Sequence, residues 1–142
     1  MKSPSSVDSG FEDLKVNTKI KLSGLWAATT FCYIYGDYFE LYLPGKLTNM
    51  LQGKMPPLGA VTQGVLLGTS IMMAIPSLMV FLSLVFKPSI NRWVNITFGM
   101  LFTAIMALAI QGTWSFYKLF GFVEIMLTLT IVWTSWKWPR NA

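Results

Sequence analysis

The stretch LGAVTQGVLLGTSIMMAIPSLMVFLSLVF, residues 58–86, decides the fold of this chain. It contains no charged residue, and it lies between Pro56-Pro57 and Lys87-Pro88, where proline interrupts a helix. A bilayer core about 30 Å thick needs roughly 20 apolar residues in a helix. The stretch exceeds that length, so it predicts a tilted transmembrane helix, with a bend at Pro76 because proline removes a backbone hydrogen bond.

Three further apolar segments reach the length of a membrane span, and helix breakers separate them. Pro44-Gly45 follows the first segment and Gly112-Thr113 follows the third, where proline and glycine favour turns. Because the later loops are only a few residues long, consecutive helices should be antiparallel neighbours. The sequence therefore predicts an all-α fold, a four-transmembrane-helix antiparallel bundle with helices at about 22–43, 58–86, 93–111 and 115–136.

The segments outside this predicted membrane domain, which covers residues 22–138, are short and polar. Residues 1–21 form an N-terminal tail, in which Ser9 and Glu12 have the spacing of a capping box and favour a short interfacial helix. Residues 139–142 form a C-terminal tail.

The composition excludes several classes of function. Only 12 % of the residues are charged, whereas a soluble protein of this size carries about a quarter. The Lys and Arg residues are scattered singly, so we expect no nucleic-acid partner. With no His and a single cysteine, Cys32, the chain lacks an intrachain disulfide and the usual metal-binding and general-base residues. We therefore expect no cofactor and assign no catalytic residue, and the sequence does not identify a metal.

Positive charges predict the orientation, because short cytoplasmic loops hold an excess of Lys and Arg. With four spans, one side of the membrane carries only Lys46, Lys54 and Lys118. The other side carries Lys2, Lys15, Lys19, Lys21, Lys87, Arg92, Lys137 and Arg140. We therefore expect a multi-pass protein of the cytoplasmic membrane with both termini in the cytoplasm.

Three acidic residues fall within the predicted spans, where charged side chains are rare and tend to face the interior of a bundle. Asp37 and Glu40 lie near the outer end of the first span, and Glu124 lies in the outer half of the fourth. A helix rises about 1.5 Å per residue, so Asp37 and Glu124 should lie at similar depths, with Glu40 closer to the surface. They can meet if the first and fourth helices pack together.

Glutamines and tyrosines at the same depth complete a predicted pocket. Apart from Lys118 at the outer end of the fourth span, no Lys or Arg lies inside any span, so a proton or a cation must neutralise the acids. Tyrosine faces can help to hold an ammonium group. Leu47, Met50 and Leu51 favour a short interfacial turn or lid over the pocket. The predicted ligand- or ion-binding residues are Asp37, Glu124, Glu40, Gln63, Gln111, Tyr33, Tyr38 and Tyr117.

This pattern favours a membrane protein that binds or transports a cation, a proton or a small amine, and two alternatives stay open. The acids of an accessory or structural subunit would only fix helix packing, and Glu40 could simply lie in interfacial water. A membrane enzyme would use them for proton transfer on a lipid-like substrate. The expected partner is the lipid bilayer, and a homo-oligomer is expected if anything crosses the membrane. Gly64 and Gly68 form a GxxxG that favours tight packing of the second helix within the bundle over dimerisation.

The run YIYGDYFELYLPG, residues 33–45, resembles the signature region of a bacterial family of small four-helix integral membrane proteins of unknown function. Later landmarks of the same family follow in the same order: Ile75-Pro76, Asn91-Arg92-Trp93-Val94-Asn95, Val123-Glu124-Ile125 and Trp136-Lys137-Trp138. The resemblance covers nearly all of residues 12–138. It implies a four-helix fold in a bacterial cytoplasmic membrane, and it implies no activity.

Overall fold

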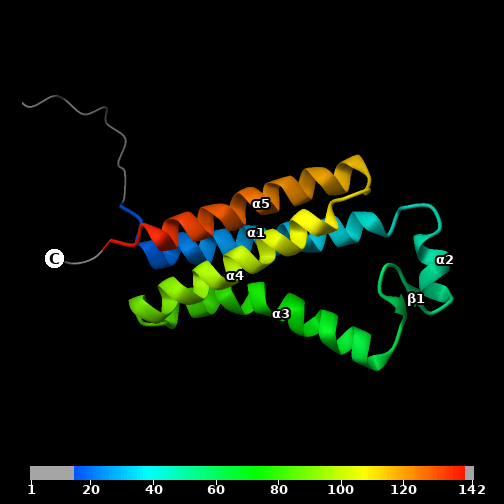
Figure 1. The fold of residues 1–142 in the computed structure, drawn as a ribbon, viewed down its shortest axis with the longest axis horizontal. Helices are drawn as coiled ribbons and strands as arrows, with labels where there is room; N and C mark the ends of the chain where they lie inside the picture. The colour runs from blue at the N-terminus through cyan, green and yellow to red at the C-terminus, as the bar shows by residue number, and fades with distance from the viewer. Residues whose placement is uncertain (1–14, 140–142) are drawn as a thin grey trace, which may run out of the picture.

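A computed structural model describes residues 15–139 of the chain. The predicted capping box at Ser9 and Glu12, and the tail beyond Pro139, lie outside these residues. The described part is mostly helical, with four long helices and one short one (Figure 1). The long helices are α1 (Thr18–Glu40), α3 (Gln63–Val85), α4 (Pro88–Ala109) and α5 (Ser115–Trp136), and the short one is α2 (Lys46–Leu51).

Three helices of the described residues, α3, α4 and α5, are long and apolar enough to cross a membrane. The expectation of a helical, membrane-compatible chain is confirmed at this level. Helix α1 has 23 residues, as many as α3, but its threonines, its tyrosines and Asp37 make it less apolar than the other three. The number of spans and their orientation therefore stay predictions.

Local chemistry sets helix bounds that differ from the expected ones. Helix α3 begins at Gln63 rather than at 58, because strand β2 (Gly59–Ala60) pairs antiparallel with β1 (Lys54–Met55) and Thr62 then caps the helix. Helix α4 begins at Pro88 rather than at 93, since proline fits the first position of a helix.

The first loop contains a helix in place of a simple turn. Gly45 adopts a left-handed conformation with φ of 81°, ends the turn that follows α1 and leads into α2. The apolar residues that predicted an interfacial turn, Leu47, Met50 and Leu51, lie on α2 and are exposed.

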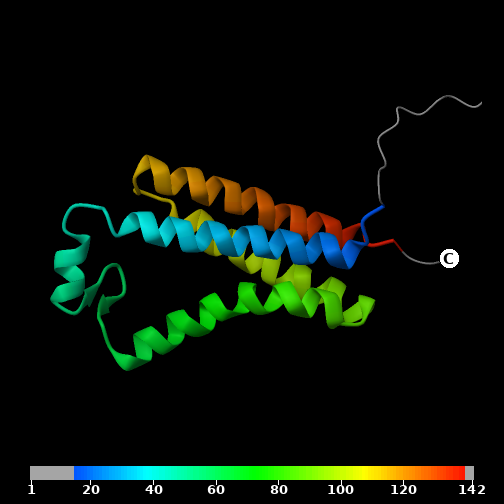
Figure 2. The same cartoon turned by 180° about the vertical axis from the view of Figure 1, so that it is seen from behind.

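Consecutive long helices run in opposite directions (Figures 1 and 2). Helix α1 packs against α3 on one side and α5 on the other, and α5 also packs against α4, whereas α3 and α4 touch at few points. We call the end that holds Asn17, Lys87 and Trp138 the basic end. The opposite end, which holds α2, the β1–β2 hairpin and the α4–α5 turn, is the loop end.

Helix α3 leaves the other helices toward the loop end, and its ribbon changes direction along its length (Figure 2). Its buried residues, Pro76, Met79 and Ser83, all lie in the half nearer the basic end. A Cβ atom added at Gly68 would meet nothing within 4 Å, and one at Gly64 would meet only the Thr62 hydroxyl at 3.9 Å. The prediction that this GxxxG packs tightly within the bundle is therefore wrong.

Helices α4 and α5 make the closest contact in the described structure. A Cβ atom at Gly99 would lie 2.7 Å from Val132 Cγ2 and 3.3 Å from the backbone oxygen of Thr128. Glycine at this position lets the two backbones approach, as small residues do between membrane helices.

A buried hydrogen-bond network near the basic end joins three helices, and we call it the asparagine network: Trp26, Ser83, Asn91 and Asn95. The Trp26 indole N–H donates to Asn95 Oδ1 at 2.7 Å, and the Ser83 hydroxyl donates to the same oxygen at 3.3 Å. Asn95 Nδ2 donates to Asn91 Oδ1 at 2.6 Å, and Asn91 Nδ2 donates to the backbone oxygen of Ser83 at 2.6 Å. One asparagine side chain thus holds α1 and α3 on α4.

Replacing Asn95 with leucine tests this network. Asn95→Leu keeps the size of the side chain but leaves the Trp26 indole N–H and the Ser83 hydroxyl without their acceptor. We expect the free energy of unfolding to fall by about 2 kcal/mol. Thermal unfolding in detergent, followed by circular dichroism, measures the change.

Thr97→Leu is the matched control, because Thr97 is exposed on the same helix. It should change stability by less than about 0.5 kcal/mol. Equal stability of the two variants would show that the asparagine network does not hold the helices together.

Candidate functional site

Glu124 lies in the interior of α5 and is only 2 % exposed. It shares the buried face of α5 with Gly121, Thr128, Ile131 and Ser135, at the spacing of helical turns. Its Oε2 atom is buried and has no hydrogen-bond partner among the described residues. This carboxyl oxygen has been removed from water and has gained no hydrogen bond within the described residues in return.

Tyr33 brings a second unpartnered polar group from the facing helix. It is buried on α1 with 8 % exposure, and its ring packs against Phe102 with centroids 6.0 Å apart. Its hydroxyl has no hydrogen-bond partner among residues 15–139. Tyr33 lies close enough to Glu124 for the charge of the carboxyl to act on it. Two unsatisfied polar groups, one from α1 and one from α5, are therefore buried within reach of each other's charge.

Asp37 and Tyr117 lie around this pair. Asp37 is one helical turn from Tyr33 on α1, is exposed, and is near enough for its charge to act on Glu124. Tyr117 is half-buried near the start of α5 and lies within reach of the charges of both acids. We call Tyr33, Asp37, Tyr117 and Glu124 the acidic site. These are the predicted residues that the structure brings together.

The other predicted site residues make different contacts. Glu40 forms a 2.7 Å ion pair with Lys46 at the start of α2. The Tyr38 hydroxyl is 2.9 Å from the Tyr42 hydroxyl on the exposed side of α1. Gln111 is exposed, and its amide donates to the backbone oxygen of Ala107 at 3.4 Å. Gln63 is exposed at the start of α3, in the half of that helix that leaves the others.

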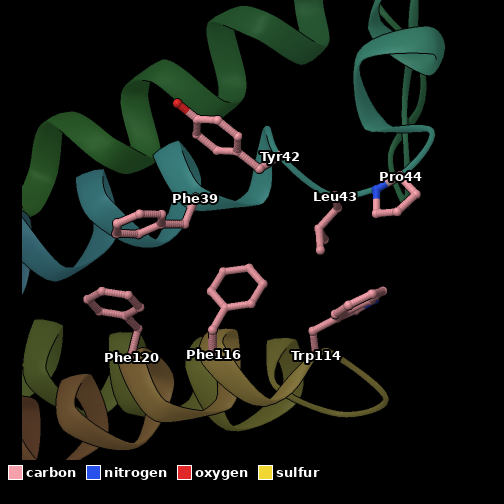
Figure 3. A pocket seen from close by; sticks show the side chains of 7 residues that line it. All are labelled: Phe39, Tyr42, Leu43, Pro44, Trp114, Phe116 and Phe120. Atoms are coloured by element: carbon pink, nitrogen blue, oxygen red, sulfur yellow. The ribbon is translucent and has the colours of Figure 1, made fainter.

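An aromatic pocket of about 500 Å³ lies beside the acidic site at the loop end (Figure 3). Phe39 approaches it from the end of α1, Phe116 and Phe120 face Phe39 from α5, and the ring of Tyr42 points away from them. The rings of Phe39 and Phe120 are stacked with centroids 6.3 Å apart. Phe120 precedes Glu124 by four residues, so it lies one turn nearer the loop end on the same side of α5. The full lining is Phe39, Tyr42, Leu43, Pro44, Trp114, Phe116 and Phe120.

The aromatic pocket is not predicted from the sequence, although Phe116 and Phe120 have the spacing of one helical turn. Such phenylalanines in a membrane helix usually face lipid, so their spacing alone does not indicate a pocket. The sequence does not show that Leu43 and Pro44, in the turn after α1, line the same pocket as the residues at the start of α5.

The chemistry available at the acidic site follows from its charges. The one ion pair of the described residues joins Lys46 to Glu40, and Lys46 is also near enough for its charge to act on Asp37, so Glu124 is the acid left without a basic partner among these residues. No group of three His, Cys, Asp or Glu side chains within residues 15–139 is arranged to hold a metal ion. A buried carboxyl without a counterion is stable only if it is protonated or if a cation lies against it. The acidic site therefore has the chemical groups to hold either a proton or a cation.

Comparison with curated proteins and with solved structures gives no match. Comparison with protein families gives one that spans nearly the whole chain, including every helix described above. The chain belongs to a family of unknown function, DUF6326, whose model matches residues 11–142.

Proposed function

We propose that this protein crosses the bacterial cytoplasmic membrane four times and binds a small organic cation between α1 and α5 in exchange for a proton. One observation carries the proposal: Glu124 Oε2 and the Tyr33 hydroxyl are buried on packed helices without hydrogen-bond partners among the described residues. A side chain that only packed between helices would not need a carboxyl group at position 124. A cation supplies both the counter-charge and the missing contacts.

The packing of α1 supports a fourth span. Its 23 residues reach about 35 Å at about 1.5 Å per residue, which matches the thickness of a bilayer core. It packs against α5, and against α3 in the half nearer the basic end, so several of its polar side chains meet protein and not lipid. Trp26, Thr29 and Tyr33, which lower its hydropathy, are all buried.

The charges at the two ends support the orientation. Within the described residues, only Lys46, Lys54 and Lys118 lie at the loop end, whereas the basic end carries Lys15, Lys19, Lys21, Lys87, Arg92 and Lys137. Positively charged ends stay in the cytoplasm. The acidic site and the aromatic pocket then lie in the outer half of the membrane.

Thiol labelling tests this orientation in a Cys32→Ala background. Val16→Cys and Ser89→Cys place thiols at the basic end, and Thr48→Cys places one on α2, all at exposed positions. A membrane-impermeant maleimide added to intact cells should label Thr48→Cys alone, and cell lysis should make the other two reactive. Labelling of Val16→Cys in intact cells would contradict the proposed crossing of α1.

The exchange follows from charge neutrality in a medium of low dielectric constant. In the empty site, Glu124 holds a proton, because a bare carboxylate would be costly there. When an ammonium group enters, the proton leaves to solvent by way of Asp37 at the exposed rim, and the carboxylate pairs with the ammonium. The net charge of the interior stays the same. The Tyr33 hydroxyl accepts a hydrogen bond from the ammonium group, and the tyrosine faces add cation–π attraction.

The aromatic pocket indicates which cations fit best. Its lining is almost entirely apolar, and it lies one helical turn from Glu124. An amine with one apolar substituent can place the substituent among Phe39, Phe116 and Phe120 while its ammonium group reaches Glu124. Benzylammonium meets these requirements and serves as a probe.

Calorimetric titration of the purified protein with benzylammonium tests the exchange. Titrations in two buffers of different ionisation enthalpy measure proton release, which should be close to one proton for each cation bound. Glu124→Gln removes the charge at nearly constant shape and should weaken binding by at least about ten-fold. Glu40→Gln, the comparison variant, removes an acid that is paired with Lys46 and whose charge also reaches Asp37 and Tyr117, and it should weaken binding clearly less than Glu124→Gln does.

Glu124→Asp separates binding from folding, because it keeps the carboxyl group and should retain proton release. If benzylammonium does not bind to the wild-type protein, or binds equally well to Glu124→Gln, the acidic site is not a cation site. A loss of thermal stability in Glu124→Gln without any change in binding would assign Glu124 to helix packing.

A further inference from the structure

A second cavity, of about 760 Å³, lies at the basic end, far from the acidic site along the helices. The beginnings of α1 and α4 and the end of α5 surround it. Its lining is polar and aromatic, in contrast to the apolar pocket at the loop end. Lys19 and Arg92 come from α1 and α4, Thr18 and Ser89 provide hydroxyls, and Trp93 and Trp138 provide rings.

The charges of this cavity are all positive within the described structure. The acidic side chains of residues 15–139 are Asp37, Glu40 and Glu124, and none of them lines the cavity. Lys19 lines the cavity, and its Nζ donates to the backbone oxygen of Leu84 on α3 at 3.1 Å. An anion is the complementary occupant.

Two tryptophan rings and one hydrogen bond hold Arg92 in place, and its guanidinium still has N–H donors without a partner among the described residues. Its guanidinium lies 5.5 Å from the ring centroid of Trp93 and 5.7 Å from that of Trp136, and Nη2 donates to the Trp136 backbone oxygen at 3.4 Å. Its Nε atom is buried and has no hydrogen-bond partner among the described residues. A guanidinium has five N–H donors in a fixed plane, which suits the oxygens of a phosphate group.

Two helix N-termini reinforce the positive potential. Helix α1 begins at Thr18 and α4 at Pro88, and both residues line the cavity. Helix α4 has no side-chain cap, and its helical hydrogen bonds begin with the Asn91 amide, which donates to the Lys87 oxygen at 2.9 Å, so the Ser89 and Ile90 amides have no partner within the helix. Free amides and the helix dipole both favour an anion at this position.

The tryptophans indicate the level at which the cavity lies in the membrane. Tryptophan side chains gather at the level of lipid headgroups, and this cavity holds Trp93 and Trp138 at its wall. We propose that the cavity binds the phosphate group of an anionic phospholipid from the cytoplasmic leaflet. This inference rests on the proposed membrane orientation and is independent of cation binding at Glu124.

Lipid titration of the purified full chain in detergent tests the proposal, with the shift in melting temperature and native mass spectrometry as readouts. Phosphatidylglycerol should stabilise the protein and remain bound in the spectrometer, whereas phosphatidylcholine should do so at least about ten-fold less strongly. Arg92→Gln should weaken phosphatidylglycerol binding by about ten-fold, because it removes the charge and the planar donors.

Lys137→Gln is the matched control. Lys137 is exposed at the same end, and its Nζ lies 4.1 Å from the ring centroid of Trp133. It does not line the cavity. It should change lipid affinity by less than about two-fold. If Arg92→Gln does not fold, Lys19→Gln, on the other helix of the cavity, should show a reduced shift in its place.

Two results would overturn the proposal. Equal effects of Arg92→Gln and Lys137→Gln would mean that lipid responds only to the net charge of the basic end. An equal melting shift with inorganic phosphate would identify a soluble ion, not a lipid, as the ligand. Loss of lipid binding in Arg92→Gln, with benzylammonium binding unchanged, would support this site separately from the acidic site.

Discussion

The side chain of Asn95 is the constraint on which the arrangement of the helices depends. Consecutive helices α3 and α4 touch at few points, yet α3 still packs against α1. The asparagine network explains this, because Asn95 accepts from both Trp26 and Ser83 while Asn91 holds the backbone of Ser83. In a membrane, where lipid is as apolar as the side chains, such polar contacts and close packing replace the hydrophobic effect as the forces between helices.

The position of this network explains the different character of the two ends. Near the basic end, α1, α3 and α4 are joined by hydrogen bonds between buried groups, and Ser23 adds a 2.7 Å bond to the backbone oxygen of Val80. No buried residue of α3 lies before Pro76, so this half is free to leave the other helices. The acidic site consequently belongs to α1 and α5 alone. Its polar groups lack the partners that a fully closed set of helices would have supplied.

Helical periodicity predicted part of the site and could not predict the rest. The spacing of Tyr33 and Asp37 on one helix, and of Tyr117 and Glu124 on another, identifies faces that can meet, and the packing of α1 on α5 brings them together. Periodicity does not say which helices are neighbours in space. Gln63 therefore has the expected position along its helix but lies on one that turns away.

Two other features had weak signals in the sequence. Asn91 and Asn95 are one helical turn apart in an apolar segment, which is a recognisable sign of a buried polar contact between helices. The β1–β2 hairpin, by contrast, has no alternating pattern, because each strand has only two residues. Its effect is to shorten α3 and move its start away from the acidic site.

The two proposed sites have opposite charge and lie at opposite ends of the helices. In the proposed orientation, Arg92 and Lys19 would face the cytoplasmic surface, where anionic lipids are found, and Asp37 would face the outer side.

The most direct test of the central claim is the protonation state of Glu124 in a membrane. Infrared difference spectra of the wild-type protein in lipid should contain a carbonyl band from a protonated carboxyl group that is lost when benzylammonium is added. The band should be absent from Glu124→Gln. A wild-type spectrum without this band, or a band that the cation leaves unchanged, would contradict the exchange of a proton for a cation at Glu124.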